Sequence, residues 1–203
     1  MKERGMIFNG EMVRAILDGR KTQTRRIMKP QPEPCPRGGH WWPSNVFKTM
    51  LHVEDEMQNG KGGWGGLVGD ACPFGDVGDR IWVREAFASG LSTKSTLAYR
   101  ATHKREDLED GFYDTIKWTP SIHMPRWASR ILLEITDVRV ERLKSISDGD
   151  AIREGCSIAD MKSGDCVADV FARLWASIYG AESWNANPWV WVIEFKRVEG
   201  GAA

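Results

Sequence analysis

SRILLEITDVRVERL, from Ser129 to Leu143, has the pattern of one long β-strand. Successive side chains of a strand point to opposite faces, so every second residue shares a face. The apolar residues follow this rule and then continue one position out of step: Ile131, Leu133, Ile135, then Val138, Val140. The change of phase at Thr136–Asp137 predicts a bulge or bend, which is common where a sheet curls into a barrel.

Three stretches elsewhere in the chain also read as strands. We predict strands in GDRIWVREAFA (78–88) and PWVWVIEFKRV (188–198), and a partner strand for the first of these in STLAYRA (95–101). No strand–helix–strand rhythm is present. Short strands with helices confined to the connections predict an α+β fold, either a small mixed β-barrel or a strongly curved sheet.

Two connections near the C-terminus carry helix signals. SISDGDAIREG (145–155) has Ser147 as N-cap, acidic residues in its first turn and Gly155 as stop, so we predict a two-turn helix that ends with Glu154. GDCVADVFARLWASIYG (164–180) places apolar residues at helical spacing over its whole length. It is the clearest helix in the sequence.

A third helix precedes a basic motif near the N-terminus. GEMVRAILDG (10–19) has one apolar face, with Asn9 or its successor as N-cap and Gly19 in the position of a left-handed stop. GRKTQTRR (19–26) follows, and we predict an edge strand or extended loop for KTQTRRI (21–27). By itself this motif fits a solvated charged loop, a phosphate-binding turn or the centre of an active site.

Residues from about 30 to 76 differ in composition from the rest. They are rich in Pro, Gly and Trp, with little periodic apolar pattern. We predict a partly irregular insertion, either a functional lid or a disordered segment in its glycine-rich half, while Trp41 and Trp42 indicate packing in the other half. We therefore expect a single domain over residues 1–198 with this insertion and a frayed tail at 199–203.

The composition is that of an ordinary globular protein. Of 203 residues, 41% are hydrophobic and 28% charged, and the formal net charge is zero. A neutral chain has no global attraction for nucleic acid or anionic membranes, so any basic surface must be local. Positive charge is concentrated in residues 1–30, where eight Lys and Arg face three acids. With no apolar run of about 20 residues and no signal-peptide core, we expect a cytoplasmic protein without membrane association.

The four cysteines indicate neither a disulfide framework nor a paired metal motif, so we expect reduced thiols and no cofactor. One zinc site remains conceivable, although its ligands lack paired spacing: Cys35, His40, His52 and Cys72.

Four segments in order resemble the ASCH family, whose members have a PUA-like β-barrel: AILDGRKTQTRR, GDRIWVRE, DAIREG and WVIEFKRV. The resemblance is strongest at the basic motif and covers most of the chain outside residues 30–76. It implies a PUA-like small mixed β-barrel, in a longer form similar to phage- or prophage-encoded members and hence a bacterial host. RNA, single-stranded nucleic acid or a modified nucleoside is the implied partner.

Some small ASCH proteins are amidohydrolases that remove the acetyl group of N(4)-acetylcytidine. The resemblance assigns their catalytic lysine, threonine and glutamate to Lys21, Thr24 and Glu154. A threonine needs a base to take its proton, and a lysine is a base only when neutral. Lowering a lysine pKa from ~10.4 to ~7.5 requires roughly 4 kcal/mol. We expect this energy to come from repulsion by nearby arginines, with burial as a second contribution. The candidates are Arg20, Arg25 and Arg26.

Two groups of residues are candidates for binding a ligand. The first belongs to the basic motif: Arg20, Thr22, Arg25 and Arg26. The second lies in SIHMPRWASR, where cations beside a tryptophan fit a nucleotide clasp or, equally, a loop whose tryptophan fills the core: His123, Arg126, Trp127 and Arg130. A hydrolase of a modified base, a non-catalytic nucleic-acid binding module and a ribonuclease therefore stay open as functions.

Overall fold

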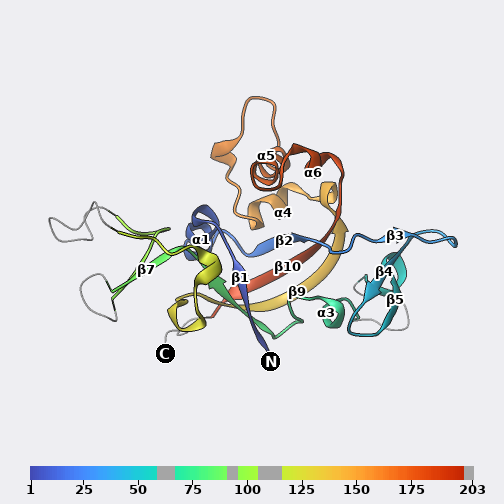
Figure 1. Cartoon of the computed structure of the whole chain (residues 1–203). Coiled ribbons are helices and arrows are strands. Elements are labelled where there is room, and N and C mark those ends of the chain that lie inside the picture. Colours follow the sequence, from blue (N-terminus) through green and yellow to red (C-terminus); the bar gives the residue numbers. More distant parts are fainter. Residues whose placement is uncertain (59–66, 91–95, 105–115, 199–203) are drawn as a thin grey trace.

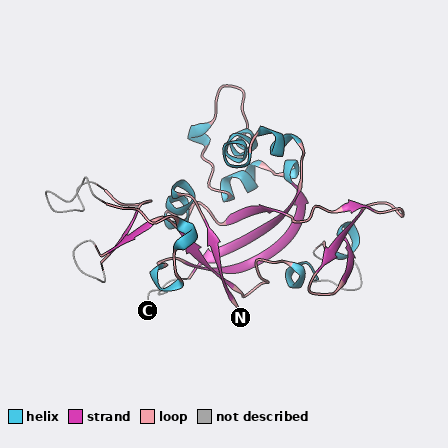
Figure 2. Ribbon diagram, in the orientation of Figure 1, coloured by secondary structure: helices cyan, strands magenta, loops and turns pink. Residues whose placement is uncertain are grey.

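A curved five-stranded sheet forms the centre of the computed structural model, which describes residues 1–58, 67–90, 96–104 and 116–198 (Figures 1 and 2). Its strands occur in the order β1 (Glu3–Ile7), β6 (Arg80–Arg84), β9 (Leu132–Arg142), β10 (Trp189–Arg197) and β2 (Gln23–Ile27). The pair β1–β6 is parallel and the other neighbours are antiparallel. The fold is thus mixed α+β, and the strands predicted at 78–88, 129–143 and 188–198 are confirmed.

The bulge predicted from the phase change is present. Glu194 of β10 pairs with Asp137, whereas the next residue, Phe195, pairs with Ile135. Thr136 is therefore the extra residue on β9, and the side chains on either side of it can all reach the same core. Val138 and Val140 are 1% exposed, like Ile135.

Both faces of β10 are buried, which explains why its sequence is apolar at nearly every position. Trp191 and Ile193 belong to the larger core, together with side chains of β6, β9 and the N-terminal helix. Val190 and Val192 pack instead against the C-terminal helices. In Figure 1 these helices lie together on one side of the sheet: α4 (Asp148–Arg153), α5 (Val167–Tyr179) and α6 (Ala181–Asn185).

The predicted helix ends agree with the structure. Helix α1 (Gly10–Leu17) begins after Asn9, whose Oδ1 accepts the Met12 N–H at 2.8 Å, and Gly19 follows with φ of 74°. Ser147 caps α4 in a reciprocal capping box with Asp150. These caps are local interactions, so the sequence alone indicates them.

The Pro/Gly/Trp-rich segment is more ordered than predicted. It forms a three-stranded antiparallel sheet and two short helices: β3 (Glu33–Pro34), β4 (His40–Ser44), β5 (Thr49–His52), α2 (Val53–Glu56) and α3 (Leu67–Ala71). Trp42 is 5% exposed and packs edge-on against Trp191 of the central sheet, with ring centroids 5.4 Å apart. The segment therefore shares the main core. Residues 59–66, in its glycine-rich half, and the tail 199–203 lie outside the described residues.

The strand predicted at 95–101 pairs beyond the central sheet. β8 (Leu97–Tyr99) forms a two-stranded sheet with β7 (Phe87–Ser89), the continuation of the 78–88 stretch. Figure 1 shows this hairpin at one end of the molecule and β3–β5 at the other.

In the described part of the chain, β1 and β2 are the two edges of the central sheet and do not pair with each other, so the sheet does not close into a barrel. No helix of the described residues has the length and apolar character needed to span a membrane.

Candidate functional site

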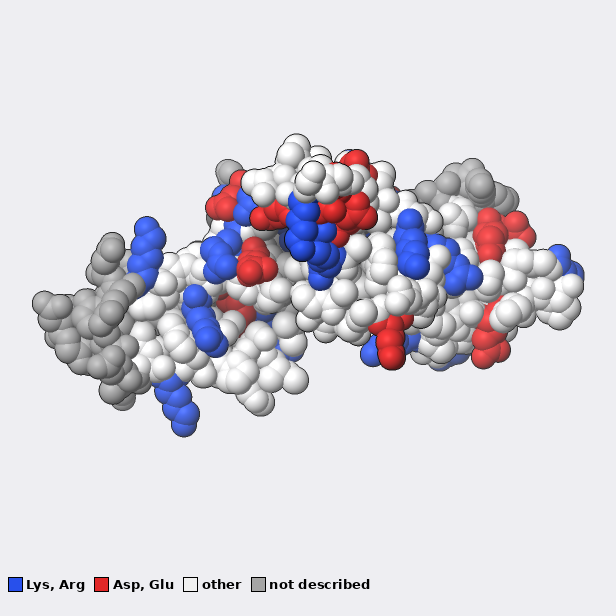
Figure 3. Space-filling view, turned by 90° about the horizontal axis from the view of Figure 1, so that it is seen from above, with Lys and Arg blue, Asp and Glu red and all other residues white. Residues whose placement is uncertain are grey.

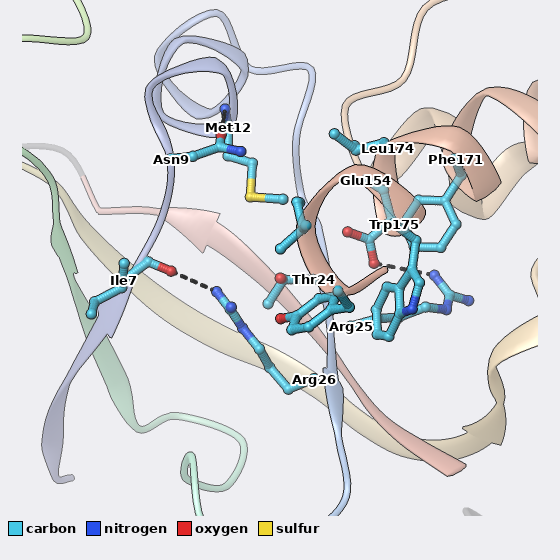
Figure 4. Close-up of a pocket in the computed structure, with 12 residues that line it drawn as sticks. Ile7, Asn9, Met12, Thr24, Arg25, Arg26, Glu154, Phe171, Leu174 and Trp175 are labelled. Carbon is cyan, nitrogen blue, oxygen red and sulfur yellow. Dashed lines mark hydrogen bonds and ion pairs between the residues drawn. The ribbon is translucent and has the colours of Figure 1, made fainter. Parts of the chain in front are cut away.

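A cavity of about 270 Å³ lies where the sheet fails to close, between the end of β1 and the free edge of β2 (Figure 4). The N-terminal segment, β2, the end of α4 and one face of α5 all line it: Ile7, Asn9, Met12, Thr24, Arg25, Arg26, Glu154, Phe171, Leu174, Trp175, Ile178 and Tyr179. The cavity is mainly apolar, with three charged groups and one threonine hydroxyl among its walls. It thus contains the second half of the basic motif.

Hydrogen bonding orients the backbone of β2 at this cavity. Thr22 O accepts the Phe195 N–H at 2.8 Å, and the Met28 N–H donates to Trp189 O at 3.0 Å. In an antiparallel pair, the main-chain N–H and C=O groups of every second residue bond to the same neighbouring strand. In β2, the main-chain groups of the even-numbered residues therefore point to β10. The main-chain N–H of Arg25 therefore points to the free edge, where the cavity lies.

Lys21 precedes β2 and forms a buried ion pair with the end of α4. Its Nζ donates to Glu154 Oε2 at 2.7 Å and to the main-chain oxygen of Glu154 at 2.8 Å. The two side chains are 0% and 2% exposed. The basic motif is thus joined to the end of α4 through Lys21 and Glu154, two of the three residues that the family resemblance assigns to one site.

Burial lowers the pKa of Lys21 below its ordinary value because the ammonium loses its hydration. Glu154 opposes this by stabilising the charged form, and the positive charge of Arg26 adds to the lowering. Burial, and not repulsion by the arginines, is thus the larger cause of the lowered Lys21 pKa, which corrects the order expected from the sequence.

The two Nη atoms of Arg25 contact three carboxylates, while its buried Nε–H has no acceptor among the described residues. Its guanidinium donates to Glu154 Oε1 at 3.2 Å and Glu141 Oε2 at 3.1 Å, and it lies 3.5 Å from Asp150 Oδ2. The side chain has no exposed surface. The charge of Arg25 is therefore neutralised within the protein.

Arg26 is placed differently. Its Nη2 donates to the main-chain oxygen of Ile7 at 2.8 Å, and the guanidinium carbon lies 5.1 Å from the centre of the Phe8 ring. Among the described residues no carboxylate pairs with it, and its Nε–H is buried without an acceptor. The cavity therefore has an uncompensated positive charge at Arg26.

Thr24 lies on the cavity wall with Arg25 and Arg26, the residues that follow it in β2. It is 2% exposed and lines the same cavity as Glu154, and no hydrogen bond to its hydroxyl occurs in the described part of the chain. Lys21 and Thr24 need not follow strand alternation, because Lys21 lies before the first residue of β2. Lys21 and Thr22 thus form a short loop ahead of the strand.

Two other predicted ligand residues of the motif lie outside this cavity. Arg20 is exposed and binds the main-chain oxygen of Gly155 at 3.1 Å and Asp18 at 3.2 Å, beside a neighbouring polar hollow. Thr22 is half-buried and uses its main-chain N–H to bind Arg153 O at 2.8 Å.

The second predicted group does not line the cavity either. Arg130 forms a two-pronged ion pair with Glu85, at 2.9 and 3.0 Å, and stacks on Tyr99. Arg126 pairs with Glu3 at 2.9 Å. Exposure is 70% for Trp127, so the alternative in which this tryptophan fills the core is wrong, and His123 is also exposed.

The aromatic wall of the cavity was not identified as part of a site. Trp175 and Tyr179, whose ring centroids are 4.4 Å apart, continue the apolar stripe of α5 to its last turn. The sequence carries one sign of this wall: the apolar stripe of α5 continues to a tyrosine in the last turn, beyond the residues needed to fill the core.

No group of three or more His, Cys, Asp or Glu that could hold a metal occurs among the described residues. No family model, no curated protein and no solved structure matches the chain.

Proposed function

We propose that this chain is an ASCH-like amidohydrolase that removes an acyl group from a modified base, with N(4)-acetylcytidine as the model substrate. The observation that carries the proposal is the buried contact of Lys21 with Glu154, 2.7 Å long, at a cavity lined by Thr24. In this proposal the central sheet is an open form of the PUA-like barrel.

The cavity favours one base over a nucleic-acid strand. Its volume of about 270 Å³ is near the lower end of ligand pockets, which run from roughly 300 to 1,000 Å³. The rings of Phe171, Trp175 and Tyr179 give it an apolar wall against which a planar base can pack. On the face shown in Figure 3, basic and acidic side chains lie side by side and do not gather into a basic groove.

The burial of Lys21, which lowers its pKa, supports a role as the base in the proposed reaction. Neutral Lys21 takes the proton of the Thr24 hydroxyl, and the oxygen attacks the carbonyl carbon of the acyl group. The bond from that carbon to the base nitrogen then breaks, and the nitrogen receives the proton that Lys21 Nζ took from Thr24. Water releases the acid from Thr24 in a second step. Glu154 orients Lys21 in this scheme, because its two oxygens are held by Lys21 and Arg25.

One observation favours the alternative function, a nucleic-acid binding module. Trp127 exposes 70% of its surface beside Arg126, an arrangement that fits stacking of an unpaired base. This function predicts a salt-dependent affinity for single-stranded oligonucleotides that Trp127→Ala weakens. The ribonuclease remains the third and least supported function.

The direct test is release of cytidine from N(4)-acetylcytidine, followed by chromatography. We expect turnover by the wild type and loss of at least a hundredfold in kcat/KM for Lys21→Ala and Thr24→Ala, because general-base catalysis alone contributes about 10²–10⁴. The exposed Lys144 and Thr49 provide matched controls, and Lys144→Ala and Thr49→Ala should match the wild type. An inactive wild type, or equal activity in all five proteins, excludes the proposal.

A further inference from the structure

We propose that Arg26 is a further catalytic residue, whose guanidinium stabilises the oxyanion formed when Thr24 attacks the acyl carbonyl, together with the main-chain N–H of Arg25. This inference rests on the proposed function. The sequence had given neither group this role: Arg25 and Arg26 were both candidates for binding a ligand and for lowering the pKa of Lys21.

The positions of the side chains support this role. Thr24 and Arg26 are two residues apart in β2, so their side chains share a face of the strand. Both line the cavity, and Figure 4 shows the two side chains on the same side of β2. An acyl carbonyl attacked by Thr24 Oγ1 therefore develops its oxyanion beside the wall that holds Arg26.

The guanidinium of Arg26 is held in place before any ligand binds. The Ile7 carbonyl and the Phe8 ring fix it on two sides. Such preorganised donors are effective because they need no rearrangement when charge develops. Arg26 lines the cavity and pairs with no carboxylate of the described residues, so its positive charge is available to an anion formed there.

Arg25 contributes through its backbone. Its side chain is neutralised by acids, but its main-chain N–H points away from β10 to the free edge of the sheet. This amide directly follows the proposed nucleophile. The amide after a nucleophilic residue is a common oxyanion donor, since the attacked carbonyl necessarily lies close to it.

The step balances as follows. The Thr24 oxygen forms a bond to the carbonyl carbon, its proton passes to Lys21 Nζ, and the electron pair of the C=O double bond moves to the oxygen. Arg26 and the Arg25 N–H stabilise that negative charge. When the double bond re-forms, the bond to the base nitrogen breaks and the nitrogen is protonated.

Two substitutions of Arg26 separate this role from a structural one. Arg26→Lys retains the positive charge but lacks the planar fork and its Nε–H, and Arg26→Gln loses both. We expect kcat for N(4)-acetylcytidine to fall about 10²–10³-fold in both variants, with KM changed less than about threefold, as for removal of one oxyanion donor. Arg37→Gln, at an exposed arginine over Trp41, is the matched control and should behave as the wild type.

The pH profile gives a second readout. Arg26 helps to lower the pKa of Lys21, so removing its charge raises that pKa and moves the rising limb of kcat/KM to higher pH. Arg26→Gln should show this displacement and Arg26→Lys should not.

The two proposals fail in different ways. If the wild type hydrolyses the substrate while both Arg26 variants stay within threefold of its kcat, Arg26 has no part in stabilising the oxyanion and only this inference is overturned. A rise in KM with kcat unchanged also overturns it, since it shows ground-state binding. An inactive wild type overturns both.

Discussion

At the scale of single residues, the ion pair of Lys21 and Glu154 combines two roles. It connects Lys21 to the end of α4, 133 residues away, and it joins a lysine of lowered pKa to Glu154, which lines the cavity. A buried pair of this kind contributes little net stability, because the loss of hydration offsets the attraction between the charges.

The pair should show strong thermodynamic coupling. We predict that Lys21→Met and Glu154→Leu each lower the free energy of unfolding by about 3–5 kcal/mol, because the first leaves Glu154 with Arg25 alone and the second leaves the buried Lys21 ammonium without its carboxylate. The double variant should recover most of this loss. Urea unfolding, followed by circular dichroism, measures the free energy of unfolding of the wild type, both single variants and the double variant. If the losses of the two single variants add up in the double variant, the two charges do not interact.

At the scale of elements, the site depends on how β2 and α4 are joined. The main-chain N–H of Thr22 binds the carbonyl of Arg153, so the basic motif is tied to the last turn of α4. That turn carries Glu154, and the capping box of Ser147 and Asp150 fixes the other end of the same short helix. The position of Glu154 therefore depends on local capping as well as on the ion pair.

Asp150 makes the stability of this region depend on pH. Burial raises its pKa, but hydrogen bonds from Ser147 and Arg153 and the charge of Arg25 outweigh this and lower it to about 2. A carboxyl whose pKa is lower in the folded state contributes stability above its unfolded pKa, and this is lost as the pH falls towards 2.

We predict that Asp150→Asn lowers the free energy of unfolding at pH 7 by about 2 kcal/mol, the value of a shift of almost two pKa units. The difference from the wild type should shrink as the pH falls from 5 to 2.5. Urea unfolding across this range measures it, and a difference that is constant with pH would contradict the assignment.

At the scale of the whole molecule, the central sheet supports one core on each face, and the 30–76 segment contributes to the larger one. Trp42 joins the β3–β5 sheet to Trp191 of β10. The segment is therefore a part of the domain that packs on its core rather than a loop attached to its surface.

This packing has a testable consequence. We predict that Trp42→Ala lowers the free energy of unfolding by about 3–5 kcal/mol, as for other buried tryptophans, while the protein still unfolds in one transition. The half-buried neighbour Trp41 is the control, and Trp41→Ala should cost clearly less. Two separate transitions in the wild type would show that the segment folds independently of the sheet.

The sequence by itself determined the features that arise from near neighbours. Alternation identified three strands of the sheet and the bulge at Thr136, and capping residues identified the ends of α1 and α4. These predictions held because a cap, a stop glycine and a change of phase each act within a few residues. The strand β1 was missed, since its residues have no clear alternation and its register depends on β6.

Only the tertiary structure decided which charges remain available. Arg25 and Arg26 are adjacent and indistinguishable in the sequence, yet Arg25 meets acids of β9 and α4 while Arg26 meets a carbonyl and a phenyl ring. The acids that neutralise Arg25 lie more than a hundred residues away, and the cavity exists because β1 and β2 approach without pairing. Long-range packing sets both features, and no local pattern records it.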